Sequence, residues 1–64
     1  MNSHTRDVIL KHFGNQNRMS KALSVSRQVV SIWFSDGFIP PKQAIIIEEL
    51  LNNDAVKAID MINK

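Results

Sequence analysis

Residues 16–35, with the sequence QNRMSKALSVSRQVVSIWFS, decide the fold of this chain. Apolar residues recur in this stretch at spacings of three and four, which predicts one helix over residues 16–23 and a second over residues 27–34. Asn15 and Ser26 precede these helices and are favourable N-cap residues. Two helices joined by a turn of about three to four residues form a helix-turn-helix unit. We therefore expect a helix-turn-helix over about residues 16–35.

The residue types of this segment suit a tight turn. Ser20 is small enough for the two helices to approach closely, and Val25 is an apolar anchor inside the turn. Val30 and Trp33 would attach the second helix to the rest of the domain. Ser24 stands where glycine is usual, because such turns often need a positive φ, and a serine there is slightly strained. Three residues of the first helix are expected to face the core, namely Met19, Ala22 and Leu23.

The second helix divides into two faces when each residue is advanced by about 100°. One face is large and apolar and consists of Val29, Val30, Trp33 and Phe34. The other consists of Arg27, Gln28, Ser31, Ile32 and Ser35. This second face carries no acid, whereas an ordinary solvated helix favours Glu, Lys and Ala. We interpret it as a binding face, the alternative being a plain solvated surface.

The side chains of that face suit the edges of DNA bases. Arg27 can form two hydrogen bonds with guanine, and Gln28 can do so with adenine. Ser31 can bond a base or a phosphate, and Ile32 can contact the methyl group of thymine. A helix of about two turns can insert its N-terminal half into the major groove. The sequence thus predicts that these four residues read DNA bases.

The start of the first helix predicts a phosphate contact. Unpaired N–H groups at a helix N-terminus attract anions. Asn15, Gln16 and Asn17 lie there, and all three are neutral donors with no competing acid. Three further residues are candidates for positioning contacts with phosphates, namely Ser26, Ser35 and Lys42. For Lys42, a plain surface charge is an equally supported interpretation.

Three further helices complete the prediction. They are expected over residues 6–13 with Thr5 as N-cap, over residues 41–51 with Pro41 in the first turn, and over residues 54–62 with Asn53 or Asp54 as N-cap. Residues 35–40 are expected to form an irregular connection. No segment alternates apolar and polar residues with a period of two, so no strand is expected. The sequence predicts an all-α, five-helix single domain of residues 1–64.

The last two helices carry more apolar residues than one buried stripe needs. In the first of them the stripe is Ala44, Ile47 and Leu51, with Ile46 and Leu50 beside it. Ile45 lies off this stripe, near Lys42 and Glu49. In the last helix, Val56, Ile59 and Ile62 either cover the core or, together with Ile45, build a modest self-association surface. The sequence leaves these two alternatives open.

Length and composition exclude several classes of protein. A chain of 64 residues buries too little surface for a deep substrate pocket, so neither an enzyme nor a small-molecule substrate is expected. Without cysteine it has no disulfide, thiolate zinc site or cysteine nucleophile. His4 and His12 have no carboxylate at ligand spacing, so we expect no metal and no cofactor. The longest apolar run, residues 44–47, is far too short to cross a membrane.

The net charge of +2 conceals an uneven distribution. Residues 1–35 hold five Lys and Arg against one acid, which is +4. Residues 36–64 hold three Lys against five acids, which is −2. The basic half therefore contains the predicted helix-turn-helix, as expected of a surface that approaches phosphates.

Several motifs carry a resemblance to a known family. They are His12-Phe13-Gly14, Lys21-Ala22-Leu23, Val25-Ser26, Val30-Ser31, Trp33, Ile39-Pro40 and Ile47-Glu48. With them the chain resembles the Cro repressors of lambdoid bacteriophages over about residues 7–50, in particular the all-helical subgroup, to which the YdaS-like antitoxins are also similar. The resemblance implies a five-helix, lambda-repressor-like DNA-binding domain that binds operator DNA, commonly as a dimer on pseudo-palindromic sites. Residues 54–64 match less well.

The expected function is a sequence-specific transcriptional repressor that binds double-stranded operator DNA. We expect it in the cytoplasm of a bacterial host, associated with the nucleoid, as a weak homodimer or as a dimer formed on DNA. Two alternatives remain open at this stage. One is an antitoxin-like DNA-binding protein that also binds a toxin. The other is a helical protein-interaction module that does not bind DNA.

Overall fold

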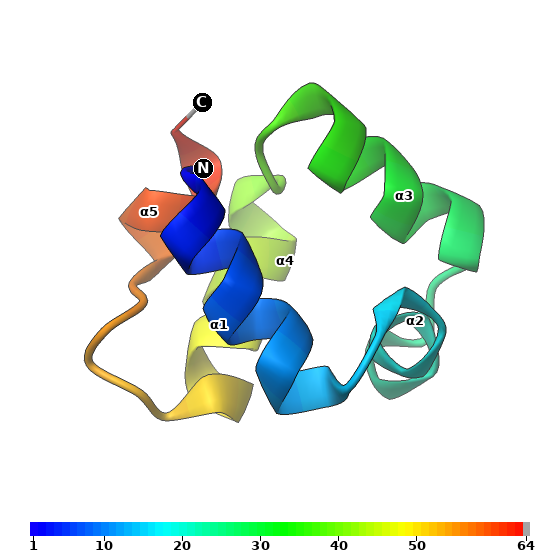
Figure 1. Cartoon of the computed structure of the whole chain (residues 1–64), viewed down its shortest axis with the longest axis horizontal. Coiled ribbons are helices and arrows are strands. Elements are labelled where there is room, and N and C mark those ends of the chain that lie inside the picture. Colours follow the sequence, from blue (N-terminus) through cyan, green and yellow to red (C-terminus); the bar gives the residue numbers. More distant parts are fainter. Residues whose placement is uncertain (64) are drawn as a thin grey trace.

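The computed structural model describes residues 1–63 and consists of α-helices, with no strand among these residues. In chain order the helices are α1 (Ser3–Phe13), α2 (Gln16–Leu23), α3 (Arg27–Asp36), α4 (Pro41–Leu51) and α5 (Ala58–Ile62). Figure 1 shows α1, α4 and α5 grouped on one side and the α2–α3 pair on the other. The five-helix, all-α prediction is confirmed, and the helix-turn-helix spans residues 16–36. Lys64, which the charge count included, lies outside the described residues.

One hydrophobic core joins all five helices and two of the connections between them. Its buried members are Ile9, Met19, Val30, Trp33, Phe34, Ile39, Ala44, Ile47, Leu51, Val56 and Met61. The backbone N–H of Ile39 donates to the carbonyl of Met61 at 2.7 Å. This bond fastens the segment before α4 to α5. The helix-turn-helix thus packs on a base to which α1, α4 and α5 all contribute.

The first helix begins earlier than the sequence suggested. The side chain of Asn2 accepts a hydrogen bond from the backbone N–H of Thr5 at 2.8 Å, so Asn2 is the N-cap and α1 starts at Ser3. Thr5 is not a cap; its side chain is buried inside the first turn. Asn2 and Thr5 are both suitable N-cap residues. Because Thr5 is buried, Asn2 takes this role.

The third helix ends later than expected. It continues to Asp36 and is closed by Gly37, which has the left-handed conformation with φ of 86°. The N–H of Gly37 donates to the carbonyl of Trp33 at 2.9 Å, and glycine adopts this conformation without steric penalty. Ser35 therefore lies in the helix, not in the connection, which is residues 37–40.

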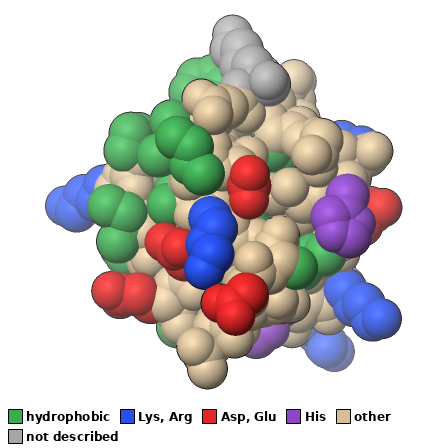
Figure 2. Space-filling view, turned by 90° about the vertical axis from the view of Figure 1, so that its left-hand side faces the viewer, with side chains coloured by type: hydrophobic (Ala, Val, Ile, Leu, Met, Phe, Trp, Pro, Cys, Tyr) green, Lys and Arg blue, Asp and Glu red, His purple; other side chains and the backbone are tan. Residues whose placement is uncertain are grey.

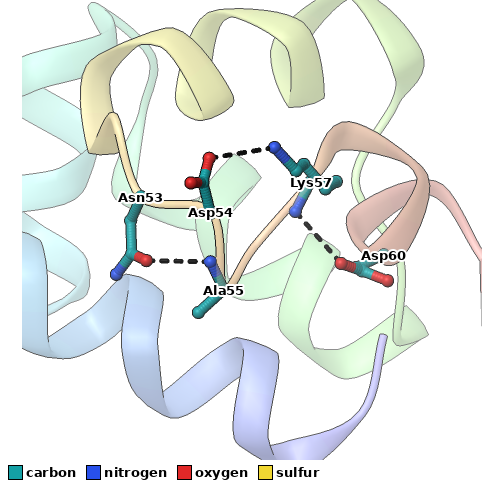
Figure 3. A network of polar contacts seen from close by, with 5 residues as sticks. All are labelled: Asn53, Asp54, Ala55, Lys57 and Asp60. Atoms are coloured by element: carbon teal, nitrogen blue, oxygen red, sulfur yellow. Dashed lines mark hydrogen bonds and ion pairs between the residues drawn. The ribbon is translucent and has the colours of Figure 1, made fainter.

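The last helix is shorter than expected, because residues 53–57 form a turn (Figure 3). The side chain of Asn53 accepts a hydrogen bond from the N–H of Ala55 at 2.9 Å, so it stabilises the turn and caps no helix. The N–H of Lys57 donates to the carboxylate of Asp60 at 3.0 Å, and α5 begins at Ala58. Val56 is buried in the connection itself.

The inner face of α2 differs from the prediction at one position. Met19 is buried and Leu23 is packed against the core, as expected, but Ala22 is exposed. Ser20 is buried instead, and its hydroxyl donates to the carbonyl of Asn17 at 2.7 Å. At about 100° per residue, the buried face is centred between Met19 and Ser20, so Ala22 falls outside it.

The turn between α2 and α3 has the conformation that the sequence predicted. Ser24 is left-handed, with φ of 58° and ψ of 39°. The N–H of Val25 donates to the carbonyl of Ser20 at 3.0 Å, and the Val25 side chain packs against the core. A left-handed conformation is disfavoured by about 1–2 kcal/mol for a residue with a Cβ atom. The turn is thus held in a strained conformation by its surroundings.

The described helices are also too short or too polar to serve as membrane spans.

Replacing Ser24 with glycine should stabilise the protein. Glycine removes the steric strain of the left-handed conformation, and its larger entropy in the unfolded chain offsets part of the gain. We expect Ser24→Gly to raise the free energy of unfolding by about 0.5–1 kcal/mol, measured by urea denaturation. Asn52→Gly is the control, because Asn52 is also left-handed but asparagine tolerates this conformation. A Ser24→Gly variant no more stable than Asn52→Gly would contradict the strain argument.

Candidate nucleic-acid interface

Helix α3 is attached to the protein by one face only. Val30, Trp33 and Phe34 are buried on that face, with 0%, 7% and 8% of their surface exposed. The opposite face is exposed and consists of Arg27, Gln28, Ser31, Ile32 and Ser35. The buried and exposed faces of α3 in the structure are thus the two faces that the helical wheel predicted. Since the helix is rigid, fixing the apolar face also fixes the direction of the polar face.

The structure brings the start of α2 beside the start of α3. Together they line an open hollow of about 750 Å³. Its lining residues are Asn15, Gln16, Asn17, Arg27, Gln28 and Ser31. Three of these are predicted base-reading residues and three are predicted phosphate contacts. Residues 15–17 and residues 27–31 are separated in the sequence, but the fold places them on one surface.

Both helices that border the hollow begin with a side-chain cap. The amide oxygen of Asn15 accepts from the N–H of Arg18 at 2.8 Å, and the hydroxyl oxygen of Ser26 accepts from the N–H of Val29 at 3.1 Å. Neither helix has an acid in its first turn. The positive ends of two helix dipoles therefore meet at one surface with no negative side chain to neutralise them, which favours an anion.

The lining of the hollow offers both donors and acceptors. Four amides, one hydroxyl and the guanidinium of Arg27 line it. Amide and hydroxyl groups both donate and accept, whereas guanidinium only donates. This set matches the mixed pattern of base edges and the acceptor oxygens of phosphates. Among residues 1–63 no group of three or more His, Cys, Asp or Glu could hold a metal ion.

Four predicted site residues lie outside the lining of the hollow. Ser26 forms the cap of α3, as described above. Ile32 and Ser35 extend the exposed face of α3 towards its C-terminal end, and Ile32 is 50% exposed. Lys42 is exposed in the first turn of α4, a different helix. The hollow therefore gathers six of the ten predicted site residues, and Lys42 is not among them.

Arg18 is a further candidate for a contact with DNA phosphate, and the sequence pattern alone did not indicate it. It lies in the first turn of α2, and its side chain covers Gly14 so closely that a Cβ there would lie 3.2 Å from its Cδ and Nη1 atoms. A cation near a helix N-terminus is unfavourable for the helix itself. Its charge there suits an anionic partner. The spacing of three residues from the Asn15 cap is the sequence signal that could have found it.

Comparison with known families decides the classification. The family model for the DNA-binding transcriptional regulator Cro, of the P22 Cro type, matches residues 4–62. The chain belongs to this Cro family of phage DNA-binding regulators. The match includes α5, where the sequence resemblance was weaker, and it defines a family of regulators, not of enzymes. No curated protein and no solved structure is significantly similar to this Cro-family chain.

Loss of the α3 cap should destabilise this Cro-family protein. Ser26→Ala leaves the N–H of Val29 without its side-chain acceptor, which typically lowers the free energy of unfolding by about 1 kcal/mol. The expected fall in Tm is about 4–8 °C, measured by circular dichroism. Ser31→Ala is the matched control, because Ser31 lies exposed within the same helix and alanine is the better helix former. Equal Tm values for the two variants would contradict the role of Ser26.

Proposed function

We propose that this protein is a sequence-specific transcriptional repressor that inserts α3 into the major groove of operator DNA. The observation that carries the proposal is the hollow at which the N-termini of α2 and α3 meet without an acidic side chain. Membership of the Cro family supports DNA as the partner. The major groove, about 12 Å wide, admits an α-helix.

In this proposal the exposed face of α3 reads the base sequence. Arg27 donates two hydrogen bonds to guanine, and Gln28 exchanges two with adenine. Ser31 lies one turn further along the same face and bonds a base or a phosphate. Ile32, which is half exposed, contacts the methyl group of a thymine. Each contact specifies a different base pair.

The start of α2 sets the position of the protein on the duplex. Asn15, Gln16 and Asn17 present backbone and side-chain donors to one phosphate, and Arg18 adds a positive charge. Two other positioning contacts come from the hydroxyl groups of Ser26, the N-cap of α3, and Ser35, within α3. Contacts of this kind fix register and orientation but do not distinguish sequences.

Repression follows from occupancy of the operator. Residues 1–64 act as one domain, and two copies bind half-sites about 34–36 Å apart, one turn of DNA. The bound pair excludes RNA polymerase from the promoter in the cytoplasm of the bacterial host. No cofactor and no enzymatic step enter this mechanism.

Selection of binding sites from a random pool of duplexes tests the proposal. We expect enrichment of a spaced palindrome, and an affinity that falls steeply as salt rises, because each neutralised phosphate contributes about −0.9 to the slope of log K against log salt. A helical module that binds only proteins would show neither. Absence of binding to any duplex at low salt would overturn the proposed function.

Substitution of the α3 readers should weaken and broaden recognition. Arg27→Ala and Gln28→Ala should each reduce the affinity for the selected operator by about 1–3 kcal/mol and relax the preference at one base pair. Lys57→Ala is the control for loss of one charge, because Lys57 precedes α5, across the molecule from α3 (Figure 1). The measurement is a binding titration against the operator and single-base variants. Unchanged affinity and preference in both α3 variants would disprove the assignment of the recognition helix.

A further inference from the structure

Ile32 is the one large apolar side chain that α3 exposes. It is 50% exposed and belongs neither to the core nor to the residues that pack against the core. The other exposed large apolar residues within residues 1–63 all belong to α4 and α5. Figure 2, which views the α5 side, shows hydrophobic side chains gathered in one area. Ile32 stands apart from the residues of α4 and α5, on a face of α3 that is otherwise polar.

Ile32 lies between two polar residues on one line along α3. Gln28, Ile32 and Asp36 are all exposed and are spaced four residues apart, so on a helical wheel each follows the one before by about 40°. Residues at this spacing have Cβ atoms about 5–6 Å apart. Side chains of a helix lean towards its N-terminus, so the carboxylate of Asp36 leans back over the turn that holds Ile32. An apolar group and a carboxylate are thus presented side by side.

The carboxylate of Asp36 has no partner within the described part of the chain. Among residues 1–63 it forms no ion pair and no side-chain hydrogen bond, and the last turn of α3 holds no basic residue. A negative charge at the C-terminus of a helix is disfavoured by the helix dipole. On a surface that faces DNA it is also repelled by phosphates. A ligand group that donates a hydrogen bond to Asp36 would offset both effects.

The edges of the pyrimidine bases differ in how well they fit this pair of side chains. A methyl group at C5 is present in thymine and in 5-methylcytosine and is absent from cytosine. In thymine the neighbouring group at C4 is the carbonyl O4, an acceptor that a carboxylate repels. In 5-methylcytosine it is the N4 amino group, a donor that a carboxylate can accept from. Of these three bases, only 5-methylcytosine therefore offers a methyl group with a hydrogen-bond donor beside it.

We propose that Ile32 and Asp36 form a recognition site for 5-methylcytosine in operator DNA. Ile32 contacts the C5 methyl group, and a carboxylate oxygen of Asp36 accepts a hydrogen bond from the N4 amino group. Thymine, the base assigned to Ile32 above, satisfies only the Ile32 half of this site, and unmethylated cytosine satisfies only the Asp36 half. The site rests on the proposed insertion of α3 into the major groove, and it makes operator affinity rise when a cytosine at this position is methylated.

Removal or addition of single C5 methyl groups locates the base pair that Ile32 reads. Each thymine of the selected operator is replaced in turn by uracil, and each cytosine by 5-methylcytosine, and binding is titrated. At one base pair the methylated duplex should bind about fourfold more tightly, the effect of about 0.8 kcal/mol for one buried CH₂ group. Ile32→Ser should abolish this difference. Ile45→Ser, the same change at an equally exposed residue of α4, should keep it.

Four operators that differ only at that base pair test Asp36. They carry uracil or thymine opposite adenine, and cytosine or 5-methylcytosine opposite guanine. The methyl group should raise affinity about fourfold in both pairs, because the purine is unchanged within each pair. Asp36→Asn should lower the ratio of affinity for 5-methylcytosine to affinity for thymine by about threefold or more, because an amide both donates and accepts. Asp7→Asn, the same change at an exposed acid of α1, should leave this ratio unaltered.

Thermal unfolding of each variant verifies that the fold is kept. Equal affinity for methylated and unmethylated duplexes at every pyrimidine overturns the assignment of Ile32, and a ratio unaltered by Asp36→Asn overturns that of Asp36. Either result leaves the proposed function intact, because the operator is still bound and its sequence is still read by Arg27 and Gln28. A protein that binds no duplex at low salt contradicts the proposed function itself, and the methylcytosine site with it.

Discussion

The burial of one face of α3 is the interaction on which the rest of the structure depends. Val30, Trp33 and Phe34 leave water together, and each fully buried side chain of this kind contributes about 1.5–3 kcal/mol. Because both faces belong to one rigid helix, this burial also aims Arg27, Gln28 and their neighbours outward. A chain of 64 residues has little surface to bury, so one helix anchored in this way both stabilises the fold and holds its polar face towards solvent.

The turn before α3 adds the second half of the site. Ser24 accepts a left-handed conformation, which lets α2 and α3 cross with their N-termini side by side. Asn15 and Ser26 satisfy the first N–H groups of both helices, and no acid neutralises the dipoles. The surface that favours anions therefore depends on the strained backbone conformation of Ser24, because this turn places the two helix N-termini side by side. The Cro family assignment makes DNA the partner of this protein, and we propose this surface as the place where it binds.

Local sequence predicted the helices well where a single start signal was present, either an N-cap residue or a proline in the first turn. Asn15 and Pro41 mark the starts of α2 and α4, and both helices have the predicted bounds. Prediction failed where two suitable caps compete within a few residues. Asn2 competes with Thr5, and the turn at Asn53 competes with a longer last helix. Burial of Thr5 and Val56 decides these cases, and burial depends on contacts that are distant in sequence.

The sequence by itself determined the type of fold, the division of α3 into two faces, and the polar side chains that its exposed face carries. These follow from helical periodicity and side-chain chemistry, which are local. Only the tertiary structure decided that Asn15 lies beside Arg27 while Lys42 does not, and that Ile45 and Ile59 stay exposed. The physical reason is that the crossing of helices sets distances between residues far apart in the chain, and exposure depends on every element that packs nearby.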